Sequence, residues 1–515
     1  MRFFFISLLL PLVSTLVAAE PGTVKFELIR EKRSPNTIDL FQHRHRHRLS
    51  RRQSSVSNTV QQILDNYSYL YYANITLGTP GQNLRLQIDT GSSDVWVQSG
   101  ENQVCQERSD PCAESGIFEP EDSSTYDVVA SDAFSIRYGD LSYARGDYAQ
   151  DSFGIGGATV HNLTVGVATN ANATEGIMGI GYASNEAIVG QQGPSSQYPN
   201  LPELMVQQGL IQSRAYSLWL NDLFASTGTV LFGGIDRAKF SGNLVELPID
   251  KFVGESSPSE FFVTLDGVGF TDTDGSRVPL VTNLREPVLL DSGTSFNYLP
   301  DRVLVSLGQA ISAQYNENLG FFVQTCAITS LNATIDFNFN GVTIQVPLNE
   351  LLYPAVTTSG RQLTFENGDP VCLLTVSSNS QIGVSILGDT FLRSAYVVYD
   401  LDNAVIGLAQ TVFNATDSDI VAIGTGSDAV PGAVVRTTTP AFGTTAELTF
   451  DVSSTAPTLH TATGSPRTTA TGVTSPTAAA TPTSTGNAGA RVDANGYSGR
   501  ALAVAAAVAA FAVRL

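Results

Sequence analysis

The feature that most constrains this chain is one short pattern that occurs twice. Residues 86–97 read Leu-Gln-Ile-Asp-Thr-Gly-Ser-Ser-Asp-Val-Trp-Val, and residues 288–296 read Val-Leu-Leu-Asp-Ser-Gly-Thr-Ser-Phe. In each copy an apolar stretch with strand character runs into an Asp-Thr/Ser-Gly turn. Each copy is followed later by two apolar residues and a glycine, at Ile177-Met178-Gly179 and at Ile386-Leu387-Gly388. One such turn alone is a weak signal, but two copies with matching approaches indicate a duplicated unit.

The duplicated turn supports one specific kind of chemistry. A strand that ends in Asp delivers the carboxylate to a fixed place, and the following glycine permits a close backbone approach. If the two units face each other, their carboxylates come together and share one proton. One carboxyl then acts as general base toward a water and the other as general acid toward a carbonyl. This chemistry requires no metal, no other cofactor and no covalent nucleophile.

Composition favours an all-β fold and excludes several functions. The 45 glycines among 515 residues, with many Val, Thr and Ser, indicate short strands and tight turns between residues 68 and 413. The 48 acidic residues against 28 basic ones give a net charge of −20, which repels nucleic-acid phosphates. No internal apolar run reaches the ~20 residues of a membrane-spanning helix.

These motifs together resemble the pepsin-like aspartic proteases over roughly residues 71–410. The resemblance also rests on residues 72–80, Tyr-Ala-Asn-Ile-Thr-Leu-Gly-Thr-Pro, and on residues 386–400. It implies a bilobal fold with two pseudo-symmetric β-lobes, at about 68–235 and 236–413, and an active-site cleft between them. The expected protease domain as a whole spans residues 53–415.

The resemblance also implies a role for each motif residue. Asp89 and Asp291 would form the catalytic dyad that binds the attacking water. Their neighbours would support them: Thr90 and Ser292 by linking the two loops, Ser92 and Thr294 by hydrogen-bonding the outer carboxylate oxygens, and Gly91 and Gly293 as the turn glycines.

A flap over the cleft is the other implied feature. Tyr138-Gly139 resembles its tip, and Trp96 is the expected partner of the Tyr138 hydroxyl, although ordinary core packing explains two aromatic residues equally well. Many family members have a second glycine where this chain has Asp140-Leu141. Leu141 would narrow the cleft, and Asp140 would favour Lys or Arg in the substrate unless it is only a solvated turn residue.

Four cysteines allow three pairings. Cys105–Cys112 and Cys326–Cys372 is the pairing that keeps each bridge within one lobe, and secretion makes free thiols unfavourable.

The N-terminus has the order of features of a secretory precursor. Residues 1–19 resemble a signal peptide, with Arg2 before an apolar run and small residues before the cut. Residues 20–52 read as a removable inhibitory propeptide that ends at Arg33 or Arg52. This segment carries nine basic and four acidic residues, whereas residues 53–487 carry 15 basic and 43 acidic ones. We therefore expect the cationic propeptide to cover an acidic cleft.

The segments near the C-terminus follow the order of a lipid-attachment signal. Residues 416–486 are rich in Ser, Thr, Ala, Pro and Gly and read as a glycosylated stalk. Residues 487–515 resemble a GPI signal with Asn487 as the attachment residue, Gly486 and Gly489 being close rivals. A short membrane anchor or a frayed apolar end is the plainer alternative. Six sequons predict N-glycans at Asn66, Asn74, Asn162, Asn172, Asn332 and Asn414.

The whole order of segments resembles the fungal surface-anchored yapsin group, whose members tend to cleave after basic residues. The sequence therefore predicts a monomeric aspartic endopeptidase of protein or peptide substrates, held at the outer face of the cell membrane or in the cell wall. Three alternatives remain open: a secreted acid protease with hydrophobic preference, a catalytically silent surface binding protein on the same fold, and, least favoured, a two-carboxylate glycosidase.

Overall fold

The structure is a computed structural model that describes residues 24–29, 59–60, 70–252, 255–357, 361–435 and 466–467. The predicted signal peptide, Arg33, Arg52, Asn66, Asn487 and most of the Ser/Thr-rich segment lie outside the described residues.

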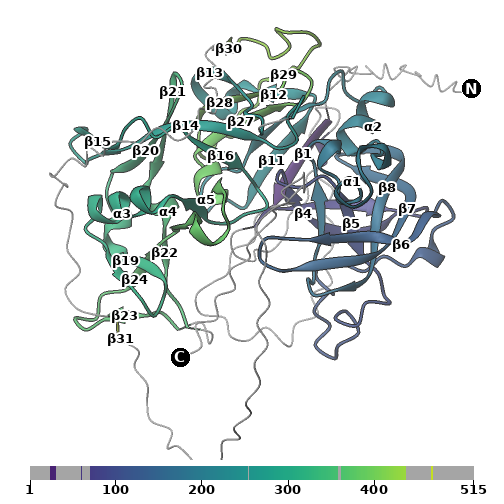
Figure 1. Cartoon of the computed structure of the whole chain (residues 1–515), viewed down its shortest axis with the longest axis horizontal. Helices are drawn as coiled ribbons and strands as arrows, with labels where there is room; N and C mark the ends of the chain where they lie inside the picture. The colour runs from purple at the N-terminus through teal and green to yellow at the C-terminus, as the bar shows by residue number, and fades with distance from the viewer. Residues whose placement is uncertain are drawn as a thin grey trace, which may run out of the picture.

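The fold is all-β and bilobal, as predicted, with one lobe drawn in blue and the other in green (Figure 1). The longest sheet runs from the first lobe through the centre of the molecule in the order β30-β13-β28-β27-β10-β11-β1-β3-β4-β9-β5-β8-β7-β6, and β2 pairs with β1. Its strands are β1 (Val24–Ile29), β2 (Thr59–Val60), β3 (Tyr72–Leu77), β4 (Gln82–Asp89), β5 (Val95–Gln98), β6 (Asp127–Arg137), β7 (Tyr143–Ile155), β8 (Ala158–Ala171), β9 (Gly176–Gly179), β10 (Ala215–Trp219), β11 (Thr227–Phe232), β13 (Phe240–Pro248), β27 (Ala395–Asp400), β28 (Val405–Thr411) and β30 (Val434–Val435).

The second lobe contains an eight-stranded sheet in the order β21-β20-β14-β16-β26-β17-β25, with β15 on β14, and a four-stranded sheet in the order β18-β19-β24-β22. Its strands are β14 (Phe262–Thr271), β15 (Arg277–Val281), β16 (Glu286–Leu290), β17 (Asn297–Leu299), β18 (Gln314–Asn316), β19 (Phe321–Thr325), β20 (Thr334–Phe339), β21 (Val342–Pro347), β22 (Leu352–Pro354), β24 (Val371–Leu374), β25 (Val376–Ser378) and β26 (Ser385–Leu387). Two small sheets pair β12 (Gly234–Asp236) with β29 (Ile420–Ala422) and β23 (Thr364–Phe365) with β31 (Pro466–Arg467).

Helices are short in the described part of the chain. They are α1 (Ala187–Gln192), α2 (Leu201–Gln207), α3 (Asp301–Ala310), α4 (Leu348–Leu351) and α5 (Asp389–Leu392). None of the described helices is long and apolar enough to cross a membrane.

The two lobes use the same local device to position their motifs. In the first lobe β4 pairs in parallel with β9, which sets Asp89 opposite Gly179, and in the second lobe β16 pairs in parallel with β26. Glycine is needed where these segments cross. A Cβ on Gly179 would lie 2.7 Å from the Asp94 nitrogen, and one on Gly388 would lie 2.3 Å from the Thr294 oxygen. The apolar-Gly segments of the sequence are therefore the partners of the two motif strands.

Both expected disulfide bonds are present. Cys105–Cys112 closes a loop of the first lobe, and Cys326–Cys372 braces the second. The described residues include no free cysteine.

The folded body extends further toward the C-terminus than the expected boundary at residue 415. Strand β29 pairs with β12, and β30 pairs in parallel with β13. Ile423 and Val430 are buried in an apolar cluster with Trp219 and Tyr396. Because these side chains lose exposed apolar area on packing, residues 416–435 belong to the body. The expected start of the stalk at residue 416 thus differs from the structure.

Candidate active site

The two motif aspartates meet at the boundary between the lobes. Asp89 is the last residue of β4, and Asp291 directly follows β16. Both carboxyl groups are fully buried, and they lie side by side: a Cβ built on Gly293 would be 2.3 Å from Asp89 Oδ1 and 3.0 Å from Asp291 Oδ1. Gln87 reaches across from the first loop, since its Nε2 donates to the Gly293 oxygen at 2.9 Å.

Each aspartate is held by the same pair of donors. The inner oxygen of Asp89 accepts from the Gly91 nitrogen at 2.8 Å, and the outer oxygen accepts from Ser92 Oγ at 2.5 Å. For Asp291 the Gly293 nitrogen and Thr294 Oγ1 donate over the same distances, 2.8 Å and 2.5 Å. The hydroxyl groups therefore occupy the positions expected from the sequence and orient both carboxyls.

The loops are linked beneath the dyad by a reciprocal set of hydrogen bonds. Thr90 Oγ1 donates to the Leu290 oxygen at 2.9 Å and accepts from the Ser292 nitrogen at 2.9 Å. Ser292 Oγ donates to the Ile88 oxygen at 3.2 Å and accepts from the Thr90 nitrogen at 3.2 Å. All of these groups are buried, so the links connect two distant parts of the sequence in a water-poor environment.

Burial dominates the electrostatics of the dyad. Loss of water raises the pKa of Asp89, and the hydrogen bond from Ser92 partly opposes that rise. Burial raises the pKa of Asp291 well above its usual range, and the charge on Asp89 raises it further. Two carboxyl groups in this environment do not both ionise readily, so the pair retains one proton over a wide pH range.

The hairpin of β6 and β7 carries Tyr138, the residue predicted at the tip of a flap. Trp96 Nε1 donates to the Tyr138 hydroxyl at 2.6 Å, and both side chains are buried in an apolar cluster. Burial raises the pKa of Tyr138 well above its usual range, and the charge on Asp89 adds to the rise. Trp96 thus both packs in the core and anchors the flap tyrosine.

The tip of the flap is a tight turn with an unusual residue. The Leu141 nitrogen donates to the Tyr138 oxygen at 3.0 Å, and Asp140 Oδ1 accepts from the Ser142 nitrogen at 2.8 Å. Leu141 has a φ of 73° and is 63% exposed. This left-handed conformation favours glycine, so leucine strains the turn here. Asp140 is close enough to Tyr298 of the other lobe to raise the pKa of that phenol, after the larger effect of burial.

The predicted glycosylation residues have different surroundings. Four are exposed on the surface: Asn162, Asn172, Asn332 and Asn414. Asn74 lies in β3 between β4 and β1, and its Nδ2 is buried. A glycan on Asn74 would have no room in the folded chain.

One polar cluster near the dyad was not identified from the sequence. Asp94 Oδ1 accepts from the Tyr148 hydroxyl at 3.0 Å and the Tyr198 hydroxyl at 2.8 Å, and Oδ2 accepts from the Ala187 nitrogen at 2.8 Å. The only sequence signal was Asp94 itself, a charged residue directly before an apolar strand. Its partners are distant in sequence, so no local pattern reveals them.

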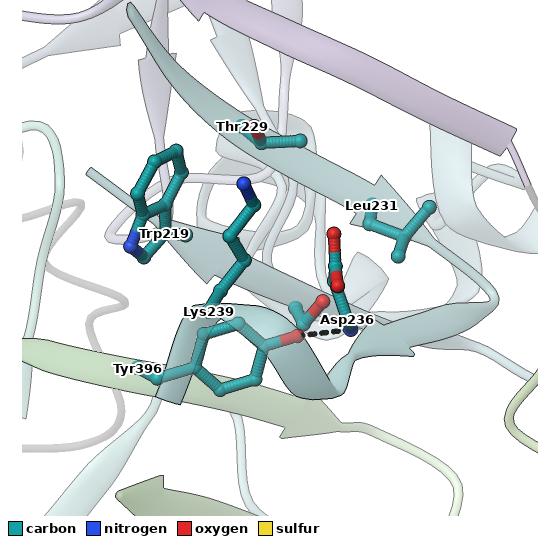
Figure 2. A pocket seen from close by; sticks show the side chains of 7 residues that line it. Trp219, Thr229, Leu231, Asp236, Lys239 and Tyr396 are labelled. Carbon is teal, nitrogen blue, oxygen red and sulfur yellow. Dashed lines mark hydrogen bonds between the residues drawn. The ribbon is translucent and has the colours of Figure 1, made fainter. Parts of the chain in front are cut away.

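A small pocket on the central sheet is lined by none of the dyad residues (Figure 2). The Lys239 ammonium lies 4.3 Å from the centre of the Trp219 ring and donates to the Ala415 oxygen at 2.7 Å. The Tyr396 hydroxyl accepts from the Asp236 nitrogen at 2.7 Å. These contacts fix the segment that follows β28 against the sheet.

Comparisons with known proteins agree with this geometry. A family model described as eukaryotic aspartyl protease matches residues 70–411. A probable aspartic-type endopeptidase, opsB, of Aspergillus fumigatus is 44% identical over 375 residues, which cover 73% of this chain and 75% of the relative. The aspartic proteinase yapsin-3 of Saccharomyces cerevisiae is 35% identical over 382 residues, covering 72% of this chain and 71% of the relative.

Proposed function

Since this chain belongs to the eukaryotic aspartyl protease family, we propose that Asp89 and Asp291 are the catalytic pair of this aspartic-type endopeptidase. The observation that carries the proposal is the matched set of hydrogen bonds that holds each of the two carboxyls in the same way. A silent binding protein would not need this symmetry.

The proposed reaction follows from the single shared proton. The ionised carboxyl accepts a proton from a water molecule while the water oxygen attacks the peptide carbonyl carbon. The protonated carboxyl donates toward the carbonyl oxygen, which gives a neutral tetrahedral intermediate. The carboxyl that took the proton of the water then donates it to the amide nitrogen, while the other carboxylate accepts a proton from one hydroxyl of the intermediate. The C–N bond breaks, an acid and an amine are released, and the pair again holds one proton. The flap, through Tyr138, holds the peptide and excludes bulk water during these steps.

Two matched substitutions test the assignment. Asp89→Asn and Asp291→Asn keep the size of each side chain but remove the acid–base function, so each lowers kcat on a peptide library at acid pH by at least about a thousandfold. Asp274→Asn is the control, because Asp274 lies in an exposed turn where Asn also accepts from the Ser276 nitrogen. Retained cleavage in either dyad variant, with the control active, contradicts the proposal.

For specificity, we propose a preference for basic residues that arises from Asp140. The influence of this carboxylate on Tyr298 supports a position facing the cleft. A Lys or Arg side chain of the substrate would be attracted to it. Asp140→Asn keeps the turn bond to Ser142 but removes the charge. We expect it to lower kcat/KM about fivefold to tenfold for peptides with Lys before the scissile bond, and not for peptides with Leu. Equal effects on both peptides favour the hydrophobic alternative.

We further propose that residues 20–52 are an inhibitory propeptide. Strand β1, from this segment, pairs antiparallel with β11 and meets β3 at Ile29 opposite Tyr72. A segment inserted in the central sheet supports a role in the folded precursor. A variant with Lys32, Arg33, Arg51 and Arg52 replaced by Gln remains uncleaved, and we expect it to be inactive until a protease of different specificity removes the segment. Equal activity of this variant and the cleaved protein contradicts the inhibitory role.

Finally, we propose secretion and attachment to the cell surface through a GPI lipid at Asn487. The support is the order of segments in the sequence, from the signal peptide to the small residues before the apolar end. Treatment of intact cells with a phosphatidylinositol-specific phospholipase should release the protein. A form truncated after residue 486 should enter the medium without the enzyme. Protein that stays on the cells after the treatment contradicts the anchor.

A further inference from the structure

Asp94 is a buried carboxylate that the hydrolytic reaction does not use. It lies five residues after Asp89 and is 0% exposed. Among the described residues it forms no salt bridge. Its three donors are instead the Tyr148 and Tyr198 hydroxyls and the Ala187 nitrogen. Burial raises the pKa of Asp94, and the hydrogen bonds from its three donors partly oppose that rise. Burying a carboxyl group is costly, so the convergence of three donors on it indicates a specific role.

The donors connect Asp94 to the base of the flap. Tyr148 lies on β7, the return strand of the flap hairpin. Its ring packs edge-on against Phe134 of β6, with centroids 5.3 Å apart, and against Tyr198, with centroids 5.6 Å apart. The hydrogen bond to Asp94 therefore joins both strands of the hairpin to the segment that follows Asp89.

The same segment also holds the tip of the flap. Trp96, two residues after Asp94, donates to the Tyr138 hydroxyl. Its ring lies 6.3 Å from that of Phe134. The hairpin is thus held at two points, Tyr148 near its base and Tyr138 at its tip, by residues of one short segment that is continuous with the Asp89 loop.

The surroundings of Asp94 make this connection rigid. Ala187 begins helix α1, and Glu186, directly before it, is fully buried. Glu186 Oε2 accepts from the Tyr198 nitrogen at 3.0 Å, which fixes the backbone of the second tyrosine. Burial raises the pKa of Glu186 to about 10, so this side chain is uncharged and adds no second charge beside Asp94 at acid or neutral pH.

We propose that Asp94 is a positioning residue for peptide hydrolysis, which with Tyr148 and Tyr198 sets the flap hairpin in register with the dyad loop. The inference rests on the proposed function of Asp89 and Asp291. Asp94 touches neither substrate nor the reacting atoms. It acts through the flap, whose position matters more for the geometry of the transition state than for binding of the peptide in the ground state, so its displacement lowers kcat more than it changes KM.

Three variants test the connection, each removing a different part of it. Asp94→Asn replaces one carboxyl oxygen by an amide donor, which turns toward either the tyrosine hydroxyls or the Ala187 nitrogen. Tyr148→Phe and Tyr198→Phe each remove one hydroxyl and keep the ring. We expect Asp94→Asn to lower kcat about 10- to 100-fold and each Phe variant about 3- to 10-fold, with KM within about threefold of the parent. The two Phe variants keep the test decisive if Asp94→Asn does not fold.

Tyr396→Phe is the matched control. Tyr396 is as buried as Tyr148, and its hydroxyl accepts from the Asp236 nitrogen at 2.7 Å (Figure 2). It lies on β27, which many strands of the central sheet separate from β6 and β7. Its loss should lower the free energy of unfolding by an amount similar to that in the flap variants. We expect kcat of Tyr396→Phe to stay within about twofold of the parent, because no contact to the flap is lost.

A spectroscopic measurement separates positioning from a general loss of stability. The chain has two tryptophans, so in a Trp219→Phe background the emission reports on Trp96 alone. In that background Tyr138→Phe removes the acceptor of the indole nitrogen and defines the shift in emission for a released flap tip. Asp94→Asn and Tyr148→Phe should shift the emission in the same direction.

The outcomes are distinct. A lowered kcat, an unchanged KM and a shifted Trp96 emission in the flap variants support the proposal. Lowered stability with kcat and emission like those of Tyr396→Phe overturns it and leaves Asp94 with a structural role only. Because the emission does not depend on the dyad, failure of the catalytic assignment appears separately, as retained cleavage in Asp89→Asn or Asp291→Asn.

Discussion

The two dyad loops are alike over five residues, 89–93 and 291–295, and differ from there on. Through the hydroxyl residue that follows each turn glycine, they have matching donors at matching distances. At the fifth residue after the aspartate, the first loop has the buried Asp94, whereas the second has Phe296, which packs edge-on against Phe321. At the seventh residue the first loop has Trp96, which donates to the Tyr138 hydroxyl of the flap. The second loop has Tyr298 at this position, and its side chain is partly exposed.

This difference separates two requirements. The reaction needs equivalent carboxyls, so the residues that hold them are matched in the two loops. The flap belongs to one lobe only, so the residues that hold it have no counterpart in the other. Substitutions in the matched part should therefore affect the chemistry, and those beyond it should affect how the flap or the fold behaves.

The largest effect is expected inside the matched part, at Gly293. A Cβ on this residue would lie 2.3 Å from Asp89 Oδ1 and 3.0 Å from Asp291 Oδ1. Gly293→Ala should therefore separate the carboxyls and lower kcat by at least about a thousandfold. Gly424→Ala is the control, because the nearest atom to its added Cβ is 3.8 Å away. Substantial activity in Gly293→Ala would contradict the claim that the reaction requires the two carboxyl groups to be in direct contact.

A smaller effect is expected where the loops are linked. Thr90→Val removes two hydrogen bonds of 2.9 Å, and Ser292→Ala removes two of 3.2 Å. We expect Thr90→Val to lower the free energy of unfolding by about 2–3 kcal/mol and Ser292→Ala by about 1–2 kcal/mol, measured by denaturant unfolding. Thr273→Val, in an exposed turn, serves as reference. If both variants match the reference, the links are not important for stability.

Outside the matched part, Glu186 makes stability depend on pH. Burial raises its pKa to about 10 from 4.5. Below about pH 4.5 Glu186 is protonated in both the folded and the unfolded form. As pH rises from there toward 10, the folded form keeps the proton that the unfolded form loses, so the free energy of unfolding declines. Between about pH 5 and pH 7 this decline is about 2.5 kcal/mol. Glu186→Gln should remove this part of the decline, whereas the exposed Glu121→Gln should not. Parallel curves for Glu186→Gln and the parent contradict the expectation.

The smallest effect concerns the strain at the tip of the flap. Leu141 has a φ of 73°, a conformation that Asn adopts more readily. Leu141→Asn should raise the free energy of unfolding by about 0.5–1 kcal/mol. Val129→Asn, at an exposed position of β6, should not raise it. A destabilised Leu141→Asn would indicate that the leucine side chain has a packing role that offsets the strain.

The duplicated motif predicted the two aspartates and most of the groups that hold them, because these groups lie within a few residues of each aspartate in the sequence. A strand that ends in Asp-Thr/Ser-Gly-Ser/Thr contains its own donors, so the family resemblance implied the roles of Ser92 and Thr294. The cross-loop bond from Gln87 and the contacts of Asp94 with Tyr148 and Tyr198 did not follow, because they depend on the packing of distant strands. Composition also placed the start of the stalk too early, since scattered apolar residues such as Ile423 and Val430 are buried only by their partners on the sheet.

The central claim is that two equivalent carboxyls share one proton, and the pH dependence of kcat/KM tests it most directly. The cleaved enzyme would be assayed from about pH 2 to about pH 8 with a peptide that has no titrating group in that range. We predict a bell-shaped profile, with one limb for protonation of the second carboxyl and one for loss of the shared proton, the latter displaced upward by the raised pKa of Asp291. A profile with a single limb, in which activity depends on one ionisation only, would contradict the account.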